Sequence, residues 1–282
     1  MNPNMAASIQ QRLLNLAHNT GQDFQRVLDQ FVLERVLYRL SQSEHQSLFV
    51  LKGAALYYLA GGRSPRPTRD LDLMAWVVDS PEALAAIFRA ICKVSCPEDG
   101  LRFDPSEVRA KRIREASRYQ GVRLMLRGNL GSARVSLQVD VGFGDAITPQ
   151  AVEANFPSML GLPTPAIMAY RWETCIAEKC EAMVALGMAN TRMKDFFDLW
   201  TLPQTVELDL VLLKQALRAT FSRRGTPWPV EIPEAMSARF AQDPQKTLQW
   251  SGFLRKSGIN PGPGLPEVID TIRTFIWPLM KD

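Results

Sequence analysis

Two aspartates placed two residues apart, Asp70 and Asp72, are the side chains of this sequence best suited to do chemistry. The surrounding apolar residues, Leu71, Leu73 and residues 75–78, predict a strand whose alternation sends both aspartates to one face. Two carboxylates this close repel each other, and a shared divalent cation turns that repulsion into ligation. Oxygen ligands of this kind suit Mg²⁺ or Mn²⁺. Taken alone, the pair could equally line the solvent-exposed face of a half-buried strand.

A third carboxylate, Asp140, is predicted on another strand. Residues 121–130 and 133–143 both alternate apolar and polar side chains, and the residues between them are typical of a hairpin turn. Asp140 falls on the polar face of the second strand. Three carboxylates are what a two-metal site for phosphoryl or nucleotidyl transfer needs, with the ions held about 3.5 to 4 Å apart.

The residues before Asp70 predict a phosphate-binding turn. Residues 47–51 resemble a short buried strand, residues 54–59 a helix stopped by Gly61 and Gly62, and Gly53 lies at the junction. A glycine there lets backbone N–H groups and a helix N-terminus approach a phosphate closely.

The remaining elements predict an α+β protein with a soft domain boundary near residue 150. Helical spacing covers residues 6–42, with a break at residues 19–22, and a capped helix is expected over residues 81–91. Beyond Pro149 the pattern is helical. The strongest of these segments are residues 171–186 and 191–202, and residues 208–223 and 265–279 also resemble helices. We therefore expect a mixed-sheet core domain over residues 1–150 and a helical domain over residues 151–282.

Composition is that of an ordinary globular protein, with 46% hydrophobic and 22% charged residues in 282. The N-terminus does not resemble a secretory signal and no apolar run could span a bilayer, so we expect a cytoplasmic protein that makes no membrane contact. Four cysteines do not form a disulfide framework. Their spacing also permits a four-thiolate zinc site, although small apolar packing is the commoner use.

The formal net charge of +4 is a mild basic bias. Its distribution is uneven, because nine basic residues crowd one third of the chain: Arg102, Arg109, Lys111, Arg112, Arg114, Arg118, Arg123, Arg127 and Arg134. Such a cluster could follow a phosphate backbone or could simply decorate the solvent side of a sheet.

Several motifs occur in a fixed order from about residue 30 to residue 202. They are Lys52-Gly53, Arg66-x-Thr68-x-Asp70-x-Asp72, Val139-Asp140-Val141, Glu178-Lys179-Cys180-Glu181-Ala182 and residues 190–199. This ordered set resembles the AbiEii/AbiGii-type nucleotidyltransferase toxins of the DNA polymerase β-like superfamily. The resemblance implies a mixed-sheet nucleotidyltransferase core with N-terminal helices and a helical C-terminal domain that completes the nucleotide site.

The resemblance also implies roles for individual residues. Asp70, Asp72 and Asp140 match the metal-binding acids, and Lys179 and Asp195 match further positions needed for activity. Nucleotide contacts are implied for Gly53, Ala54, Arg66, Thr68, Lys179 and Lys194. From spacing alone, Lys194 and Asp198 could instead form a surface pair one helical turn apart. Ala54 replaces the glycine or serine common in the family, so we expect altered nucleotide binding.

Three hypotheses for function follow. The first is a magnesium- or manganese-dependent nucleotidyltransferase toxin of a type IV toxin–antitoxin system, which transfers a nucleoside monophosphate from a nucleoside triphosphate to RNA, most consistently tRNA, and releases pyrophosphate. A cognate antitoxin is then expected. The second keeps the metal site but exchanges the acceptor for a small molecule or a protein. The third is a catalytically weak nucleotide- or RNA-binding module.

Overall fold

The computed structural model describes residues 3–61, 64–77, 79–114 and 120–281. The chain forms two compact units. The sheet unit comprises Met1–Gly144 and Val152–Ala169, and the helical unit comprises Asp145–Ala151 and Tyr170–Asp282. Val152–Ala169 lies beyond the boundary expected near residue 150 and contributes strands to the sheet unit.

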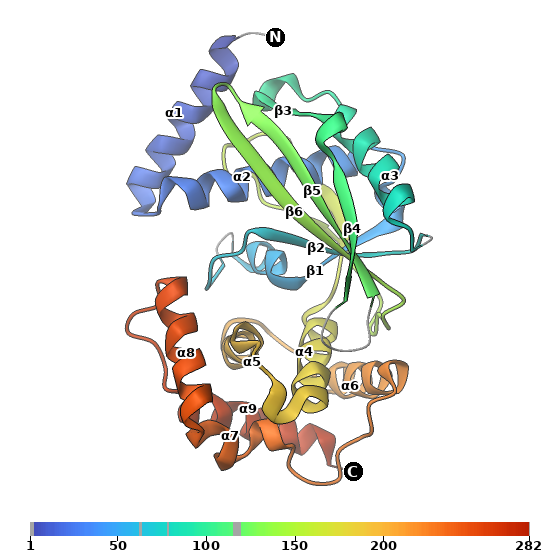
Figure 1. The fold of residues 1–282 in the computed structure, drawn as a ribbon, viewed down its shortest axis with the longest axis vertical. Helices are drawn as coiled ribbons and strands as arrows, with labels where there is room; N and C mark the ends of the chain where they lie inside the picture. The colour runs from blue at the N-terminus through green and yellow to red at the C-terminus, as the bar shows by residue number, and fades with distance from the viewer. Residues whose placement is uncertain (1–2, 62–63, 78, 115–119, 282) are drawn as a thin grey trace. The chain divides into compact units, whose positions relative to one another are not determined.

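The sheet unit is built on one eight-stranded mixed sheet (Figure 1). Its strands are β1 (Phe49–Lys52), β2 (Asp70–Ala75), β3 (Leu101–Phe103), β4 (Arg109–Arg114), β5 (Gln120–Leu130), β6 (Ala133–Phe143), β7 (Val152–Asn155) and β8 (Ala166–Ala169). Their order is β3-β5-β6-β2-β1-β8-β7, and β4 also pairs with β5. The β2–β6 and β1–β8 pairs are parallel and the other pairs are antiparallel. The α+β fold expected from the sequence is confirmed.

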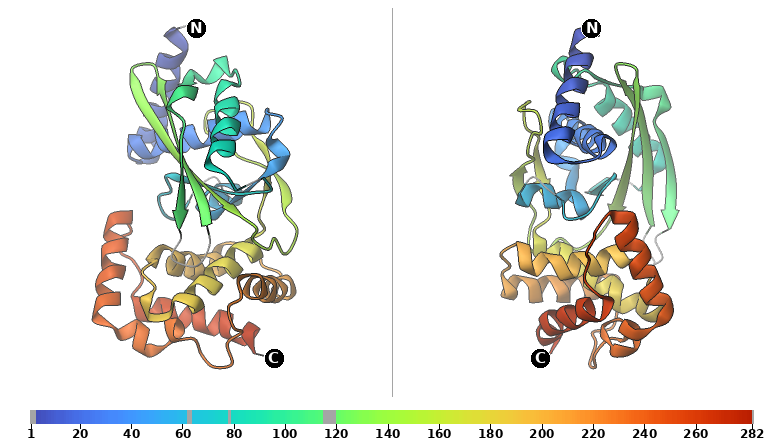
Figure 2. Two further views of the ribbon diagram at one scale, coloured as in Figure 1. Left: turned by 45° about the vertical axis from the view of Figure 1, so that its right-hand side comes forward. Right: turned by 90° about the vertical axis from the view of Figure 1, so that its left-hand side faces the viewer.

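Three helices pack on this sheet (Figures 1 and 2): α1 (Pro3–Thr20), α2 (Phe24–Ser41) and α3 (Pro81–Lys93). Asp23 and Ser80 cap α2 and α3 by accepting hydrogen bonds from backbone N–H groups. The helices and the β5–β6 hairpin lie where the sequence predicts them. The hairpin turn, at Gly131 and Ser132, is also confirmed.

Two predictions need correction. Residues beyond Pro149 are not all helical, since β7 and β8 form the edge of the sheet, with β8 hydrogen-bonded to β1. Both strands are four residues long, too short to show a period, and non-local pairing determines them. The helix expected over residues 54–59 is a 3-10 helix, η2 (Gly53–Ala60). Predictions that involve Gly62, Val78 and Arg118 fall outside the described residues.

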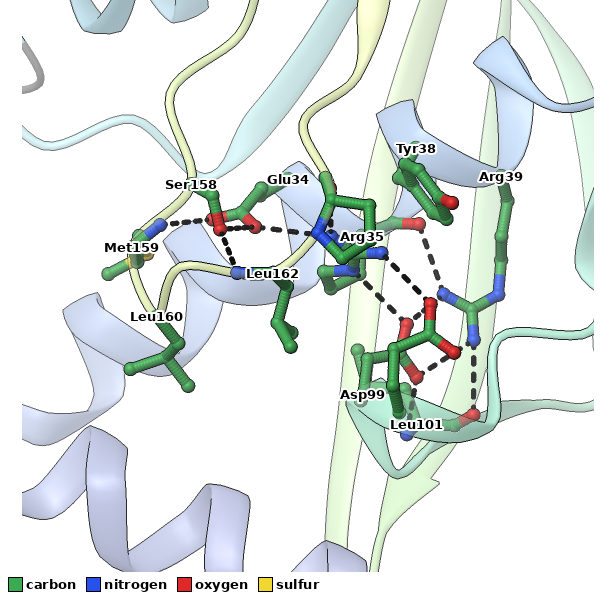
Figure 3. A network of polar contacts seen from close by, with 12 residues as sticks. Glu34, Arg35, Tyr38, Arg39, Asp99, Leu101, Ser158, Met159, Leu160 and Leu162 are labelled. Carbon is green, nitrogen blue, oxygen red and sulfur yellow. Dashed lines mark hydrogen bonds and ion pairs between the residues drawn. The ribbon is translucent and has the colours of Figure 1, made fainter.

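A buried ion network fixes α2 to the rest of the sheet unit (Figure 3). Arg39 donates to both carboxylate oxygens of Asp99, at 2.6 and 3.1 Å, and Arg35 donates to Asp99 at 3.2 Å. Glu34 accepts from the Ser158 hydroxyl and the Met159 N–H. Burial raises the pKa of Glu34, although these hydrogen bonds and Arg35 oppose the shift. The network ties α2 to the segment between β7 and β8.

In its described residues, the helical unit has six α-helices: α4 (Trp172–Leu186), α5 (Met193–Thr205), α6 (Leu210–Arg224), α7 (Ala238–Gln242), α8 (Pro244–Ser257) and α9 (Leu265–Met280). The four predicted helices correspond to α4, α5, α6 and α9. Its core includes the stacked rings of Phe196 and Phe240, whose centroids lie 5.0 Å apart. The sequence did not predict α7 and α8, because α7 has five residues and α8 buries few side chains.

All four cysteines are free and buried. Burial raises the pKa of Cys92 to about 11 and that of Cys175 to about 12. Both thiols are therefore protonated at neutral pH in the absence of a metal. In the part of the chain that the structure describes, no helix has the length and apolar character needed to cross a bilayer.

Candidate active site

The three aspartates predicted to bind metal come from two neighbouring strands. Asp70 and Asp72 belong to β2, and Asp140 belongs to β6, which runs parallel to β2. Asp72 lies directly opposite Asp140, and Asp70 lies opposite Gln138. Since neighbouring strands are roughly 4.8 Å apart, the register places all three carboxylates together on one face of the sheet.

Charged residues continue this row on both sides. Lys52, the last residue of β1, lies opposite Asp72, and Arg123 of β5 lies opposite Asp140. Four adjacent strands therefore contribute a cation, two anions and a second cation in register. This row, formed by Lys52, Asp72, Asp140 and Arg123, is called the charged row below.

Arg123 donates two hydrogen bonds to Asp140. Its Nε donates to Oδ1 and one terminal nitrogen donates to Oδ2, both at 2.8 Å. Gln138 also donates to Oδ2, at 3.2 Å. The hydrogen bond to Asp140 raises the pKa of Arg123, and the charges of Asp70 and Asp72 act in the same direction. Arg123 is thus held by the negative field of all three carboxylates.

The Asp72 carboxylate packs against Gly53, where a side chain would collide with it. Gly53 has a φ of +68°, a conformation that side-chain-bearing residues rarely adopt. A Cβ atom built on Gly53 would lie 2.1 Å from Oδ2 of Asp72, well inside contact distance. Gly53 therefore permits the carboxylate to pack directly against the turn between β1 and η2.

The other residues of the sheet unit that are expected to contact the nucleotide lie in η2 and in the segment before β2. Ala54 is buried as the second residue of η2, and Arg66 is buried in the segment that precedes β2. Burial raises the pKa of Tyr58, a residue of η2, to about 12, and the charge of Arg66 counteracts this effect. The Thr68 hydroxyl donates to the Asp70 carbonyl at 3.3 Å. These residues support the start of β2.

The donor chemistry of the row fits a divalent cation. Carboxylate oxygens on facing positions of two strands are ligands that Mg²⁺ and Mn²⁺ accept. The described residues nevertheless contain no group of three acidic, histidine or cysteine side chains already arranged around a common point. Both oxygens of Asp140 face donors from Arg123 and Gln138 instead.

A second ionic cluster lies in the helical unit. Lys179 of α4 places its Nζ 2.9 Å from Asp195 and 2.8 Å from Asp198, both on α5. Asp198 is fully buried, so it is not part of a surface pair of the kind that its spacing from Lys194 suggested. Lys194 is exposed on the same helix. Lys179 therefore links the two helices that carry the downstream motifs.

Electrostatics favour ionised Asp195. Burial alone raises its pKa, but Lys179, Lys194 and Arg192 outweigh that effect and the pKa is lowered. The loop before α5 is held from another side, because the buried Lys246 of α8 donates to the Asn190 carbonyl at 2.9 Å. The Lys179 ion pair and the Lys246 hydrogen bond thus hold α5 and the loop before it.

The acids beside Lys179 on α4 have a structural partner of their own. Arg224, at the end of α6, pairs with Glu181 at 2.8 Å, with Glu178 at 3.7 Å and with Asp145 at 3.0 Å. These carboxylates keep the pKa of Arg224 raised despite its burial. Arg224 therefore fastens α6 to α4 and to the segment that follows β6.

Arg123 and Lys246 were not singled out by the sequence. Arg123 was one of nine clustered basic residues, yet the hairpin carried a usable signal. A two-residue turn at Gly131 and Ser132 pairs Leu130 with Ala133, and counting outward pairs Arg123 with Asp140. Lys246 gave no comparable signal, because its partner is a backbone carbonyl 56 residues away.

The family assignment rests on most of the chain. A sequence model described as nucleotidyl transferase AbiEii toxin, type IV TA system, matches residues 35–273. The chain belongs to this family. The AbiEii match covers β1, β2 and β6 and also α4 and α5, so both ionic clusters lie inside it. The chain is therefore a nucleotidyltransferase of the toxin type.

Solved structures agree at the level of the fold. The crystal structure of a candidate nucleotidyltransferase from H. pylori matches with a TM-score of 0.52 and 16% identity, over 92% of this chain and 96% of that chain. JHP933 from Helicobacter pylori matches with a TM-score of 0.52 and 14% identity, over 92% and 93%. No curated protein matches the chain in sequence.

Proposed function

We propose that this AbiEii-family protein is a divalent-metal-dependent enzyme that transfers a nucleoside monophosphate from a nucleoside triphosphate to an RNA acceptor, with tRNA as the acceptor class. The observation that carries the proposal is the register of the sheet, which sets Asp72 opposite Asp140 with Asp70 two residues away on the same face. Asp70, Asp72 and Asp140 would hold the metal. When bound, Mg²⁺ or Mn²⁺ supplies Lewis-acid stabilisation of the triphosphate and of the departing pyrophosphate.

The residues around the acids have separate tasks in this scheme. An acceptor hydroxyl attacks the α-phosphorus, the bond to the bridging oxygen of the β-phosphate breaks, and pyrophosphate leaves. Asp140 is proposed to accept the proton of that hydroxyl. The turn at Gly53, with Ala54, would present backbone N–H groups to the phosphates, with Arg66 and Thr68 supporting it.

Lys179, Lys194 and Asp195 are proposed to serve nucleotide binding, because they match positions of the family's motifs. The ammonium groups of Lys179 and Lys194 would contact the triphosphate, and Asp195 orients Lys179 through their 2.9 Å ion pair. Lys194 is exposed and has the freedom to reach a ligand. Asp198, fully buried against Lys179, would complete the orientation of that side chain.

The distribution of positive charge favours RNA over a small acceptor. Strand register places five exposed basic side chains on the face that carries the acids: Arg102, Arg109, Lys111, Arg127 and Arg134. A basic surface beside the acids suits a polyanionic backbone, whereas a small-molecule acceptor has no need of one. The type IV description of the family adds an antitoxin as the expected protein partner.

The test is incubation of the purified protein with each labelled nucleoside triphosphate, Mg²⁺ and total RNA. Label in tRNA-sized RNA, absent with Asp72→Asn and retained with the surface control Glu231→Gln, is the expected result. Label on protein or on small metabolites moves the acceptor to those classes. Nucleotide binding without transfer to any acceptor contradicts the proposed activity and favours a binding module.

A further inference from the structure

We propose that Arg123 is an internal counterion that competes with the divalent cation for Asp140 and thereby sets the cation affinity of the site. This inference rests on the proposed function, because it assumes that Asp140 is a metal ligand. It concerns Arg123, which neither the motifs nor the family description assigns.

Both carboxylate oxygens of Asp140 already accept hydrogen bonds. Arg123 uses two donors on both oxygens of Asp140, at 2.8 Å each, and Gln138 adds a third donor at 3.2 Å. A bidentate guanidinium–carboxylate pair is among the stronger hydrogen-bonded arrangements in proteins. A cation that uses Asp140 must therefore displace at least one of these donors.

Asp72 and Asp140 face each other across β2 and β6, so these two carboxylates need positive charge beside them whether or not a metal is bound. Arg123 supplies it directly on Asp140. A divalent cation that enters replaces this compensation, and a guanidinium that stays would be repelled by it.

The Arg123 guanidinium has room to move away from Asp140. The Arg123 side chain is 35% exposed, so its guanidinium can turn into solvent without unpacking the sheet. The opposite holds for Arg35, which is fully buried on the carboxylates of α2 and η3 (Pro97–Asp99). A partly exposed bidentate pair is strong enough to compete with a cation and weak enough to open.

The experiment measures the affinity of the full chain for Mn²⁺ alone, by the paramagnetic resonance signal of free Mn²⁺. Arg123→Gln is expected to bind Mn²⁺ roughly tenfold more tightly than the wild type, because both the competing pair and a nearby positive charge are lost. Arg123→Lys, which keeps the charge and loses the fork, should fall between them. The matched control is Arg112→Gln. Arg112 lies on the adjacent strand β4 and pairs with Asp79 at 2.9 Å, so its loss should leave the Mn²⁺ affinity unchanged.

Unchanged or weaker Mn²⁺ binding in both Arg123 variants, with the control unchanged, overturns the proposal. Thermal unfolding checks that each variant is folded. If Arg123→Gln is not folded, the Mn²⁺ affinity of Arg123→Lys alone tests the proposal. A parallel Mn²⁺ titration of Asp72→Asn distinguishes failure of the Arg123 proposal from failure of the proposed function. Loss of Mn²⁺ binding there shows that the metal site exists, whereas wild-type binding there removes the metal site itself.

Discussion

Two arginine–aspartate pairs in the sheet unit use the same bidentate chemistry in opposite surroundings. Arg39 and Asp99 are buried together, with Arg35 and the Leu101 N–H completing the coordination of the carboxylate. Arg123 and Asp140 are partly exposed, and the carboxylate lies beside Asp72 rather than beside a second cation. The two pairs therefore have similar geometry but different neighbours.

The neighbours determine what each pair can do. A buried carboxylate with two arginines has no reason to bind another cation, and separating it from them leaves charges unpaired in a dry interior. A carboxylate beside another carboxylate is repelled by it, and a metal ion shared by both relieves that repulsion. We infer that the first pair stabilises the fold and that the second belongs to the reaction.

The sharpest contrast comes from Asp140→Asn. Loss of a metal ligand is expected to lower transfer activity by roughly a thousandfold. Because the pair with Arg123 is partly exposed, the free energy of unfolding should change by less than about 1 kcal/mol. Single-turnover transfer rates and urea denaturation measure the two effects. Wild-type activity in this variant would remove Asp140 from the site.

Asp99→Asn should show the reverse pattern. It leaves Arg35 and Arg39 buried without their carboxylate, so the free energy of unfolding should fall by roughly 3–5 kcal/mol. Activity per folded molecule should remain near that of the wild type. Urea denaturation and transfer assays below the unfolding transition check both statements. A stable but inactive Asp99→Asn protein would contradict the division of roles.

Lys179→Met extends the comparison to the helical unit. It should lower the free energy of unfolding by about 3 kcal/mol at pH 7, because Asp195 and Asp198 stay buried without their ammonium partner. Lys214→Met, which removes a surface ammonium that donates to the Lys281 carbonyl, is the control and should change it by less than about 0.5 kcal/mol. Urea denaturation at several pH values is the measurement.

The pH dependence of that penalty has a definite sign. In the wild type the pKa of Asp195 is lowered, so its contribution to stability is present above the unfolded value near 3.8 and is lost as the pH falls through the folded pKa. In the variant burial prevails and raises the pKa of Asp195, so the folded state binds protons more readily than the unfolded state. The penalty should therefore shrink as the pH is lowered from 7 toward 4, and a constant penalty would argue against buried ionised carboxylates.

Gly53→Ala probes the support of Asp72 with the smallest expected effect. The added methyl group collides with the Asp72 carboxylate, and displacement of about 1 Å can reduce activity by roughly a hundredfold. Gly61→Ala is the matched control, since nothing lies within 4 Å of its added Cβ. Steady-state transfer rates of the two variants should differ strongly, and equal rates would show that Asp72 need not pack on the turn.

The sequence predicted best where local pattern determines structure. Strict alternation located β5 and β6 to within one residue, and capping residues located α3. It failed at β8, four residues whose strand state depends on pairing with β1 more than a hundred residues earlier. Partnership between charged side chains was equally hidden. No local signal indicates that Lys179 pairs with Asp198 rather than leaving Asp198 to a surface contact.

The most direct test of the account is a crystal structure of the protein soaked with Mn²⁺, with the anomalous signal of the ion used to locate it. We expect an anomalous peak bound by carboxylate oxygens of Asp72 and Asp140, with the Arg123 guanidinium moved off Asp140. A fully loaded crystal with no peak at these aspartates, and with the Arg123 pair intact, would contradict it.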